Sequence, residues 1–427
     1  MDKILNRIVG PRKSMKIVIY SLFLCVLGSC FSGQPEAQSK AVDQFPEKDI
    51  AAADAVVEEM RPAIYQLHYS IDSLKNKRIA IVANHTSLID GTHLLDTLIG
   101  WGMEVTKVFA PEHGFRGNVA DGGKVDDTVD GKTGTPIISL YGKNKKPQSG
   151  QLAGVDLVIF DMQDVGARFY TYLSTLHNVM EACAESGIEL WVLDRPNPNG
   201  HYIDGPVLKP GFESFIGMHP VPVVYGMTIG EYARMINGEG WLKNGIRCDL
   251  RVVECVNFDR SVVYVLPVKP SPNLPDMEAI TLYPSLCFFE GTIVSVGRGT
   301  PRPFTVIGEP SNIKGNFTFV PQPIAGASVD PPQKGKTCRG YDLSTDGGNF
   351  RKLDRLELKW LLRMYNETAE KEKFFLPNNF IDKLAGTDQL RKDILSGKSE
   401  DSIRKSWSID LENFKKVREK YLIYPDI

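Results

Sequence analysis

The 427-residue sequence carries almost no net charge, because 50 Lys and Arg residues nearly balance 52 Asp and Glu residues. Its basic residues are scattered, so the electrostatic signature of a nucleic-acid-binding protein is absent, and we expect no nucleic-acid partner. Hydrophobic residues make up 42% of the chain and charged residues 24%. This balance is typical of globular proteins and excludes disordered and fibrous classes.

Cysteines are few, and they form no metal-binding pattern. The seven cysteines include no CxxC pair and no Cys/His spacing of the zinc-site kind. Cys25 and Cys30 belong to the N-terminal apolar segment. The odd number that remains favours buried single thiols over a disulfide framework, although one pair stays open among these five: Cys183, Cys248, Cys255, Cys287 and Cys338.

The apolar run of residues 17–27 is too short for a comfortable membrane span, which takes about 20 apolar residues. Basic residues precede it, so it has the length and flanks of a signal-peptide core. The run ends in LGSC, which resembles the lipobox of bacterial lipoproteins. An uncleaved anchor or a simple secretory signal is the alternative interpretation.

The lipobox resemblance implies that residues 1–30 are a lipoprotein signal peptide ending at a lipidated Cys30. Residues 31–49, rich in Gln, Ser, Glu and Lys, then form a polar tether. We therefore expect an exported lipoprotein that is anchored in a membrane by its N-terminal lipid and faces the periplasm.

From residue 77 onward, short apolar runs alternate with segments of helical spacing. Continuous apolar runs are typical of strands that are buried on both faces of a parallel sheet. The alternation predicts an α/β fold with a doubly wound, mainly parallel sheet. Strands are expected at 77–84, 104–110, 135–142, 155–162, 188–195 and 248–255, and helices at 93–102, 167–187 and 228–238.

The pattern changes near residue 256. A proline-rich segment at 267–276 marks a boundary or a crossing loop. Short strand-like segments follow, and then amphipathic helices are expected at 356–368 and 408–422. We predict an α/β catalytic domain over residues 50–258 and a smaller α+β domain over residues 259–427.

Polar side chains gather where four of the predicted strands end. In open α/β sheets, ligands bind beyond the carboxyl ends of the strands. Asp and Asn after a strand are also common cap and turn residues. For Asp90 and Asn197, this structural role is about as well supported as a role in ligand binding. Glu112 is a poor cap, because it stands between Pro111 and a His-Gly pair. The four groups are Asn84, His85 and Asp90; Glu112, His113 and Arg116; Asp161, Gln163, Asp164 and Arg168; Asp194, Arg195 and Asn197.

Several common catalytic signatures are missing. The turn after the first strand lacks GxGxxG, and no P-loop, GxSxG elbow or HExxH occurs. A metal site built from His85, His113, Asp161 and Asp164 stays open, because ligands can come from several loops.

Carboxylate chemistry of the glycosidase kind remains. It needs a protonated carboxyl group and usually a second carboxylate across the sugar. Burial at an apolar strand end would raise the pKa of Glu112. Asp161, Asp164 and Asp194 are candidates for the second group. Four aromatic residues are candidates for stacking on a sugar, although their spacing also suits a core: Phe115, Phe169, Tyr170 and Tyr172.

Long motifs then resemble one family, in shared order, from about Lys75 to the C-terminus. They are APEHGFRG, SLYG, FDMQDVGARFYTY, LDRPNPNG, SFIGMHPVPVVYGMTIGE, KPSPNLPD and FFEGTIVSVGRGTPRPF. The family is that of the exo-β-N-acetylmuramidases. The resemblance implies an exo-acting hydrolase that releases terminal β-linked N-acetylmuramic acid from non-reducing ends of peptidoglycan fragments, without a cofactor. It also implies a Rossmann-like domain, a smaller C-terminal domain and an active-site cleft between them.

The resemblance assigns the catalytic acid to Glu112, in the PEHG motif, with His113 beside it. The lactyl carboxylate of N-acetylmuramic acid suits recognition by arginine. Candidates for that contact are Arg116, Arg168, Arg195 and Arg298, although Arg168 could instead pair with Asp164. Further catalytic or substrate-binding candidates are Asn84, Asp161, Gln163, Asp164, Tyr172, Asp194, Asn273 and Glu290, with Glu290 ranked below Asp161 and Asp164 as the partner carboxylate.

The sequence departs from the family pattern at three places, and two other functions remain as alternatives. Tyr225 stands where many members have His, Ile293 stands where many have Asn, and NFDRSVVYV replaces a tryptophan-containing segment. One alternative is a tethered lipoprotein that binds muropeptides without cleaving them. The other is a metal-dependent amidohydrolase or deacetylase. Hydrolysis with retention, with inversion, or with the N-acetyl group as nucleophile are all compatible with these residues.

Overall fold

The computed structural model describes residues 59–111, 115–116, 127–344 and 354–426. Residues 57–427 form one compact unit, which is the part considered below. The predicted signal peptide, Cys30 and the tether of residues 31–49 lie outside the described residues. None of the helices in the described ranges has the length and apolar character needed to cross a bilayer.

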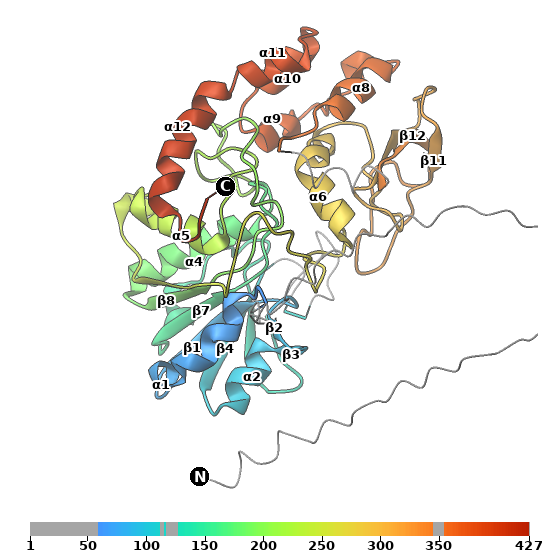
Figure 1. Cartoon of the computed structure of the whole chain (residues 1–427). Helices are drawn as coiled ribbons and strands as arrows, with labels where there is room; N and C mark the ends of the chain where they lie inside the picture. The colour runs from blue at the N-terminus through green and yellow to red at the C-terminus, as the bar shows by residue number, and fades with distance from the viewer. Residues whose placement is uncertain (1–58, 112–114, 117–126, 345–353, 427) are drawn as a thin grey trace, which may run out of the picture. The chain divides into compact units, whose positions relative to one another are not determined.

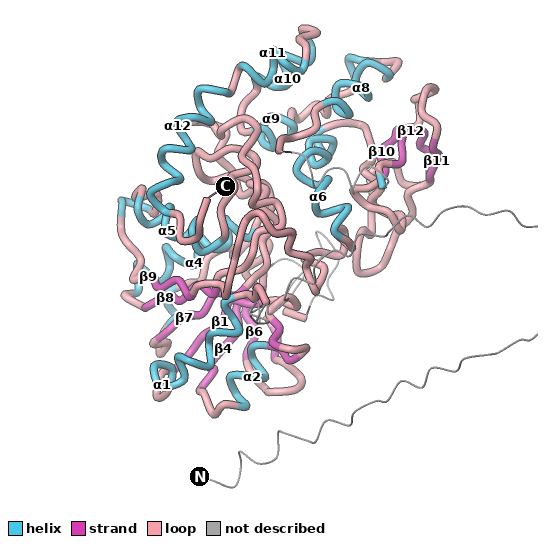
Figure 2. The backbone as a smooth tube through the Cα atoms, viewed as in Figure 1, coloured by secondary structure: helices cyan, strands magenta, loops and turns pink. Residues whose placement is uncertain are grey.

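A seven-stranded sheet is the centre of the N-terminal part (Figures 1 and 2). All neighbouring strands are parallel except β5, which runs antiparallel to β6 at one edge. The six strands expected from the sequence are all present and confirm the doubly wound α/β sheet. In spatial order the strands are β5 (Thr128–Val129), β6 (Pro136–Ser139), β4 (Glu104–Ala110), β1 (Arg78–Ala83), β7 (Leu157–Asp161), β8 (Glu189–Leu193) and β9 (Leu250–Val253).

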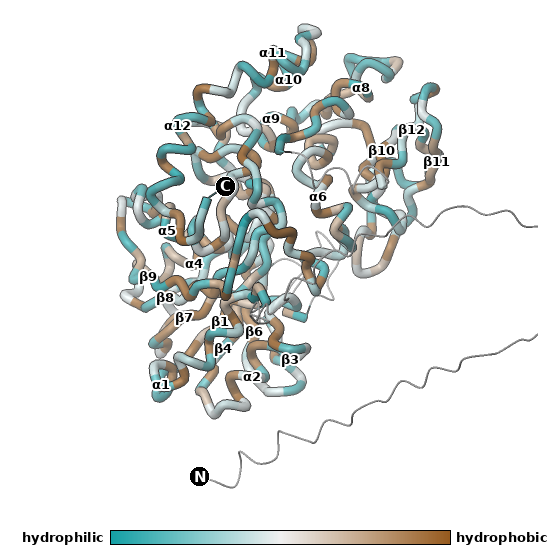
Figure 3. The backbone as a smooth tube through the Cα atoms, in the orientation of Figure 1, coloured by the Kyte–Doolittle hydropathy of each residue, from teal (hydrophilic) through white to brown (hydrophobic). Residues whose placement is uncertain are grey.

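The central strands are apolar on both faces because helices cover both sides of the sheet. Alternate residues of β1 enter different cores: Ala80 and Val82 pack in one, and Ile79 and Ile81 in the other. Figure 3 shows these strands mostly in the brown of hydrophobic residues. Helices α4 (Tyr172–Ser186) and α5 (Ile229–Gly238) cover the first face, and η2 (Ala63–Ser70) and α2 (Leu94–Gly100) cover the second.

The N-termini of two helices can be compared directly with the bounds predicted from the sequence. The predicted cap Thr228 accepts a hydrogen bond from Glu231 N, and the Glu231 side chain accepts one from Thr228 N, so a capping box begins α5. The helix expected to begin at residue 167 begins instead at Tyr172. The backbone of Arg168 donates to Val223 O at 2.8 Å, which holds residues 167–171 in an extended and turn conformation. Helix α1 (Ile71–Leu74) directly follows η2. Short elements not expected from the sequence are the β2–β3 hairpin (Leu88–Ile89, Thr92–His93) and α3 (Ser149–Leu152).

The C-terminal part contains a three-stranded antiparallel sheet and a series of helices, drawn from yellow to red in Figure 1. The helices expected at 356–368 and 408–422 are present, with shorter bounds. The elements are α6 (Met277–Leu286), η4 (Cys287–Gly291), β10 (Val306–Glu309), β11 (Phe317–Phe319), β12 (Cys338–Asp342), α8 (Lys359–Glu367), η5 (Lys371–Lys373), α9 (Phe380–Ala385), α10 (Gln389–Leu395), α11 (Glu400–Lys405), α12 (Ser408–Arg418) and η6 (Glu419–Tyr421).

The two parts share a core. The hydrophobic cluster on one face of the main sheet continues into residues of the C-terminal part such as Val294 and Phe304. The chain end also returns to the sheet, where Tyr424 Oη donates to Asp194 Oδ2 at 2.7 Å. The predicted division at residue 258 remains a prediction. All five cysteines in the described residues are buried and free, as expected for single thiols.

Candidate active site

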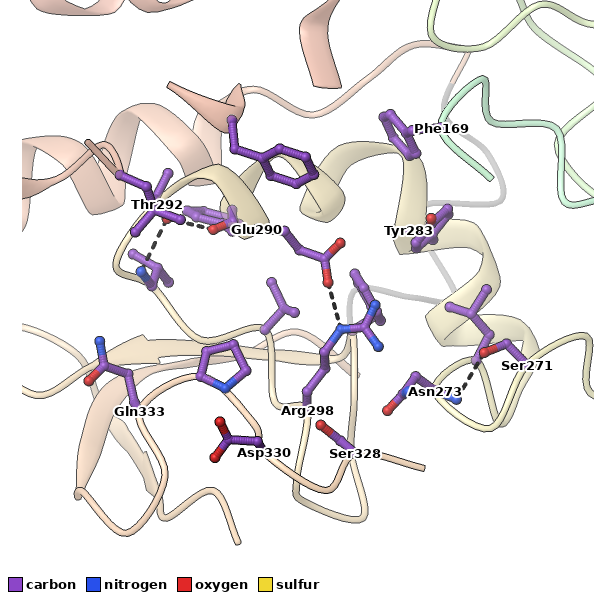
Figure 4. Close-up of a pocket in the computed structure, with 18 of the residues that line it drawn as sticks. Phe169, Ser271, Asn273, Tyr283, Glu290, Thr292, Arg298, Ser328, Asp330 and Gln333 are labelled. Atoms are coloured by element: carbon purple, nitrogen blue, oxygen red, sulfur yellow. Dashed lines mark hydrogen bonds and ion pairs between the residues drawn. The ribbon is translucent and has the colours of Figure 1, made fainter. Parts of the chain in front are cut away.

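A cavity of about 880 Å³ lies between the segment after β7 and the C-terminal part of the chain. Phe169, Tyr170 and Tyr172 line it, together with the end of η4 and the loops that follow. Figure 4 shows Phe169 on the side of the cavity away from Thr292 and Gln333. Such a cavity is large enough for a sugar with substituents. Its polar lining residues include Ser271, Asn273, Glu290, Thr292, Arg298, Ser328, Asp330, Gln333, Lys334 and Lys336.

Hydrogen bonds connect this cavity to the carboxyl edge of the main sheet. Asn84, directly after β1, donates from Nδ2 to Tyr172 Oη at 2.8 Å. Tyr170 Oη donates to Pro270 O at 2.9 Å, which ties the proline-rich loop to the segment after β7. His85 Nε2 lies 2.8 Å from Lys269 O. The cavity therefore adjoins the ends of β1 and β7, where an α/β sheet is expected to bind its ligand.

Glu290 and Arg298 form an ion pair inside the cavity. Arg298 Nε donates to Glu290 Oε1 at 2.6 Å, and the two side chains are 14% and 23% exposed. The guanidinium group also lies over the Phe304 ring, 5.1 Å from its centroid. Cys287 Sγ lies 3.5 Å from Glu290 Oε2. This is a charged pair of opposite sign that is partly open to the cavity.

Asp161 and Arg195 form a second ion pair, which is closed to solvent. Arg195 donates from Nε to Asp161 Oδ1 at 2.6 Å and from Nη2 to Oδ2 at 2.8 Å. The side chains are 5% and 0% exposed for Arg195 and Asp161. Burial lowers the pKa of Arg195, but the Asp161 carboxylate outweighs it and raises the pKa above its ordinary value. Both carboxylate oxygens are occupied, so this environment favours a structural role.

Asp164 is a buried carboxyl group with an incomplete set of partners. Its Oδ2 accepts from the Tyr225 hydroxyl and from Gly166 N, while Oδ1 has no hydrogen-bond partner within the described part of the chain. Burial raises the pKa of Asp164 to about 6. Tyr225, one of the residues that depart from the family pattern, therefore contacts one of the predicted catalytic carboxyl groups.

Asp194 is fully used in holding neighbouring elements together. It accepts from Thr228 Oγ1, Gly230 N and Tyr424 Oη, at distances of 2.7, 2.8 and 2.7 Å. Burial, followed by the nearby Glu231 carboxylate, raises the pKa of Asp194 to about 7. Its partners connect β8 to the start of α5 and to the chain end.

Arg168 and Arg116 also make contacts away from the cavity. Arg168 is buried and donates to the backbone oxygens of Pro206, Val221 and Leu384, so the alternative in which it pairs with Asp164 is wrong. Backbone carbonyls replace a carboxylate here because three chain segments converge on the guanidinium group. Arg116 donates to Asp130 Oδ1 at 3.0 and 2.8 Å.

The comparisons with known proteins identify the family. The family model described as Exo-beta-N-acetylmuramidase NamZ, N-terminal, matches residues 79–278. The model described as Exo-beta-N-acetylmuramidase NamZ, C-terminal, matches residues 281–424. The chain belongs to the NamZ family. The resemblance seen in the sequence motifs is thereby confirmed.

A curated relative and two solved structures agree with membership of the NamZ family. Peptidoglycan beta-N-acetylmuramidase NamZ of Bacillus subtilis (strain 168) is 40% identical over 373 residues, which cover 82% of this chain and 88% of the relative. A crystal structure of a DUF1343 family protein from Bacteroides fragilis NCTC 9343 matches with a TM-score of 0.80 and 45% identity, over 87% of this chain and 100% of that one. A second B. fragilis DUF1343 protein matches with a TM-score of 0.71 and 26% identity, over 86% and 99%.

Some of the site residues predicted from the NamZ resemblance line the cavity, and others do not. Tyr172, Asn273, Glu290 and Arg298 line the cavity. Glu112 and His113 lie outside the described residues. The remaining candidates make the buried or distant contacts described above, and Gln163 donates to the backbone oxygens of Asp164 and Pro196.

One loop that lines the cavity contains none of the residues predicted from the sequence. Residues 328–336 contribute a serine, an aspartate, a glutamine and two lysines to its lining. They belong to an irregular loop, so no periodicity or strand end marked them. Within the described ranges, no group of three or more His, Cys, Asp or Glu side chains is arranged to hold a metal ion.

Proposed function

We propose that this chain is an exo-acting β-N-acetylmuramidase that releases terminal β-linked N-acetylmuramic acid from the non-reducing ends of peptidoglycan fragments. The observation that carries the proposal is the match of both NamZ family models, which together span residues 79–278 and 281–424. The cavity supports it, because aromatic rings and a charged pair suit a carboxylated amino sugar.

Glu112 is the proposed general acid. It belongs to the PEHG motif and follows β4, which is hydrogen-bonded in the sheet next to β1. β1 in turn leads to Asn84 and through it to Tyr172 of the cavity. A protonated carboxyl group there would donate its proton to the glycosidic oxygen as the bond to the sugar breaks. His113 is its proposed neighbour in that step.

Glu290 is the proposed second carboxylate. Of Asp161, Asp164 and Glu290, it is the one whose side chain lines the cavity in the described structure. Arg195 occupies both oxygens of Asp161, and Asp164 is buried against Tyr225. A carboxylate that acts across a sugar must reach it, so geometry favours Glu290 over the two aspartates.

The enzyme is proposed to act as an anchored lipoprotein. The LGSC sequence after the apolar run supports lipidation at Cys30, with residues 31–49 as a tether and the enzyme facing the periplasm. Replacing Cys30 by Ser should move the protein from the membrane fraction to the soluble fraction. Retention of the Cys30→Ser protein in membranes would favour an uncleaved anchor.

Activity is tested with protein that lacks residues 1–39, wild type and Glu112→Gln. The substrates are chromogenic β-glycosides of N-acetylmuramic acid and of N-acetylglucosamine, each with and without EDTA. Wild type should cleave the muramic glycoside selectively and resist EDTA, and Glu112→Gln should lower kcat/KM by about 10²- to 10⁴-fold. Unchanged melting of the variant would show that folding is intact.

The same assay separates the alternatives. Muropeptide binding without release from either glycoside would indicate a tethered binding protein. Activity that EDTA removes and a divalent metal restores would favour the metal-dependent amidohydrolase or deacetylase.

A further inference from the structure

The cavity lining carries an excess of one positive charge among its described residues. Arg298, Lys334 and Lys336 are cationic, and Glu290 and Asp330 are anionic. A ligand with a single negative charge would bring this lining to neutrality. The charges therefore favour a monoanionic ligand over a neutral one, and the question is which cation contacts the anion.

Arg298 is held on a rigid turn. Gly297 and Gly299 have φ values of +78° and +79°, in the region that favours glycine. A Cβ atom at Gly297 would lie 2.6 Å from Arg302 O, and one at Gly299 would lie 2.6 Å from Gln322 O. The backbone around the arginine is thus packed too closely to accept another residue on either side.

Glu290 and Phe304 then fix the direction of the guanidinium group. Figure 4 shows the Arg298 side chain extending into the cavity to meet Glu290, with Asn273 and Ser328 nearby. Arg298 Nε donates to Glu290, and the guanidinium carbon Cζ lies over the Phe304 ring. A guanidinium group oriented before the ligand arrives loses little freedom on binding, which increases selectivity.

The other three arginines predicted to bind the lactyl carboxylate have partners outside the cavity. Arg168 contacts backbone carbonyls, Arg195 is bound to Asp161, and Arg116 is bound to Asp130; none of these three arginines lines the cavity in the described structure. Among the lysines of the lining, Lys334 pairs with Asp330 at 3.3 Å, and its side chain is 50% exposed. Arg298 is 14% exposed, so its charge is less screened by water.

We propose that Arg298, oriented by Glu290, binds the lactyl carboxylate of N-acetylmuramic acid and is the residue that distinguishes this sugar from N-acetylglucosamine. The inference rests on the proposed function and names the selective contact within its site. N-acetylglucosamine has a hydroxyl group in place of the lactyl ether, so it offers no carboxylate to the arginine. A polar site built for a group that the competitor lacks is an effective source of discrimination.

Binding of free sugars tests this contact without requiring catalysis. The full-length chain, kept in detergent, is titrated calorimetrically with N-acetylmuramic acid, with its lactyl carboxamide and with N-acetylglucosamine. Wild type should bind the acid about 10- to 100-fold more tightly than the carboxamide, as expected for one charge-assisted contact. In Arg298→Gln this ratio should fall to within about threefold, with an intermediate value in Arg298→Lys.

Arg302→Gln is the matched control. Arg302 is in the same segment and pairs with Asp342 at 2.6 Å, but it is not among the residues that line the cavity. Its acid-to-carboxamide ratio should equal that of wild type. Lys334→Gln should also keep the ratio, and a collapse of the ratio in that variant alone would assign the contact to Lys334 and overturn the proposal.

Two further outcomes would overturn it. One is equal affinity of wild type for acid and carboxamide, and the other is an unchanged ratio in Arg298→Gln. If Arg298→Gln does not fold, the proposal is tested by the acid-to-carboxamide ratios of wild type and Arg298→Lys. An Arg298→Lys ratio equal to that of wild type would then overturn it. Failure of wild type to hydrolyse the muramic glycoside, with the acid preference and its dependence on Arg298 intact, would reject the proposed hydrolase but support the carboxylate site.

Discussion

Two ion pairs of similar geometry illustrate the difference between the sheet and the cavity. Arg195 Nε lies 2.6 Å from Asp161 Oδ1, and Arg298 Nε lies 2.6 Å from Glu290 Oε1. The first pair is closed to solvent, whereas the second is 14% and 23% exposed and lines a cavity of about 880 Å³. The same two chemical groups therefore serve the fold in one place and face a ligand in the other.

The difference lies in what surrounds each pair. Asp161 ends a strand with five buried residues, and Arg195 occupies both of its oxygens. Glu290 is the penultimate residue of the short 3-10 helix η4, and the cavity lies beside it and the loops that follow. A buried charge is tolerated only while its partner remains, but a partly exposed charge can exchange partners. This distinction predicts opposite consequences for substitutions in the two pairs.

The largest effect on folding is expected for Arg195→Met. It leaves the Asp161 carboxylate buried without a cation, which should cost about 3–5 kcal/mol in the free energy of unfolding, measured by chemical denaturation. Lys392→Met, which breaks the exposed pair with Asp388, is the control and should cost less than about 1 kcal/mol. Similar losses in both variants would mean that burial does not separate the two kinds of pair.

A large effect on catalysis, with a smaller effect on folding than that of Arg195→Met, is expected for Glu290→Gln. Removing the second carboxylate should lower kcat/KM on the muramic glycoside by about 10²- to 10³-fold. The free energy of unfolding should fall by less than in Arg195→Met, because Glu290 and Arg298 border the cavity and water can reach the charge that remains. Glu254→Gln, at an exposed glutamate after β9, is the control for loss of a negative charge. Activity within threefold of wild type in Glu290→Gln would return the role to another carboxylate.

A smaller, pH-dependent effect is expected for Asp164→Asn. Burial raises the pKa of Asp164 from 3.8 to about 6, so the folded protein holds a proton that the unfolded chain releases at lower pH. The free energy of unfolding of wild type, relative to Asp164→Asn, should therefore fall as pH rises from about 4 to about 6. The expected fall is on the order of 2 kcal/mol.

Denaturation at several pH values between 4 and 7 measures this difference. Asp72→Asn is the control with the opposite sign, because Lys75 holds the pKa of Asp72 below its usual value. A difference between wild type and Asp164→Asn that rises with pH would show that Asp164 is stabilised as the carboxylate.

The sheet could be predicted because its signal is local. β1 and β7 are short apolar runs whose alternate residues enter two cores, and a run of that kind is legible in any single sequence. The start of α4 could not be predicted from spacing alone. Residues 167–171 continue the apolar pattern of the helix, but the backbone of Arg168 bonds to Val223, which is distant in the sequence.

The candidate site divides in the same way. The motifs around Asn273, Glu290 and Arg298 marked residues that do line the cavity. Position after a strand predicted Asp161, Asp194 and Arg168 equally strongly as site residues. These side chains instead form hydrogen bonds with buried groups. A strand end shows that a polar group is near the ligand-binding edge, but it does not show whether another side chain has already occupied that group.

The sequence by itself determined the family, the parallel sheet and the set of chemical groups available, because these depend on motifs and on local apolar periodicity. The tertiary structure alone decided which arginine faces the cavity and which loop, residues 328–336, forms its far wall. The physical reason is that the partner of a buried charge is set by contacts between segments that are distant in the sequence. Arg168 and Leu384, for example, are 216 residues apart.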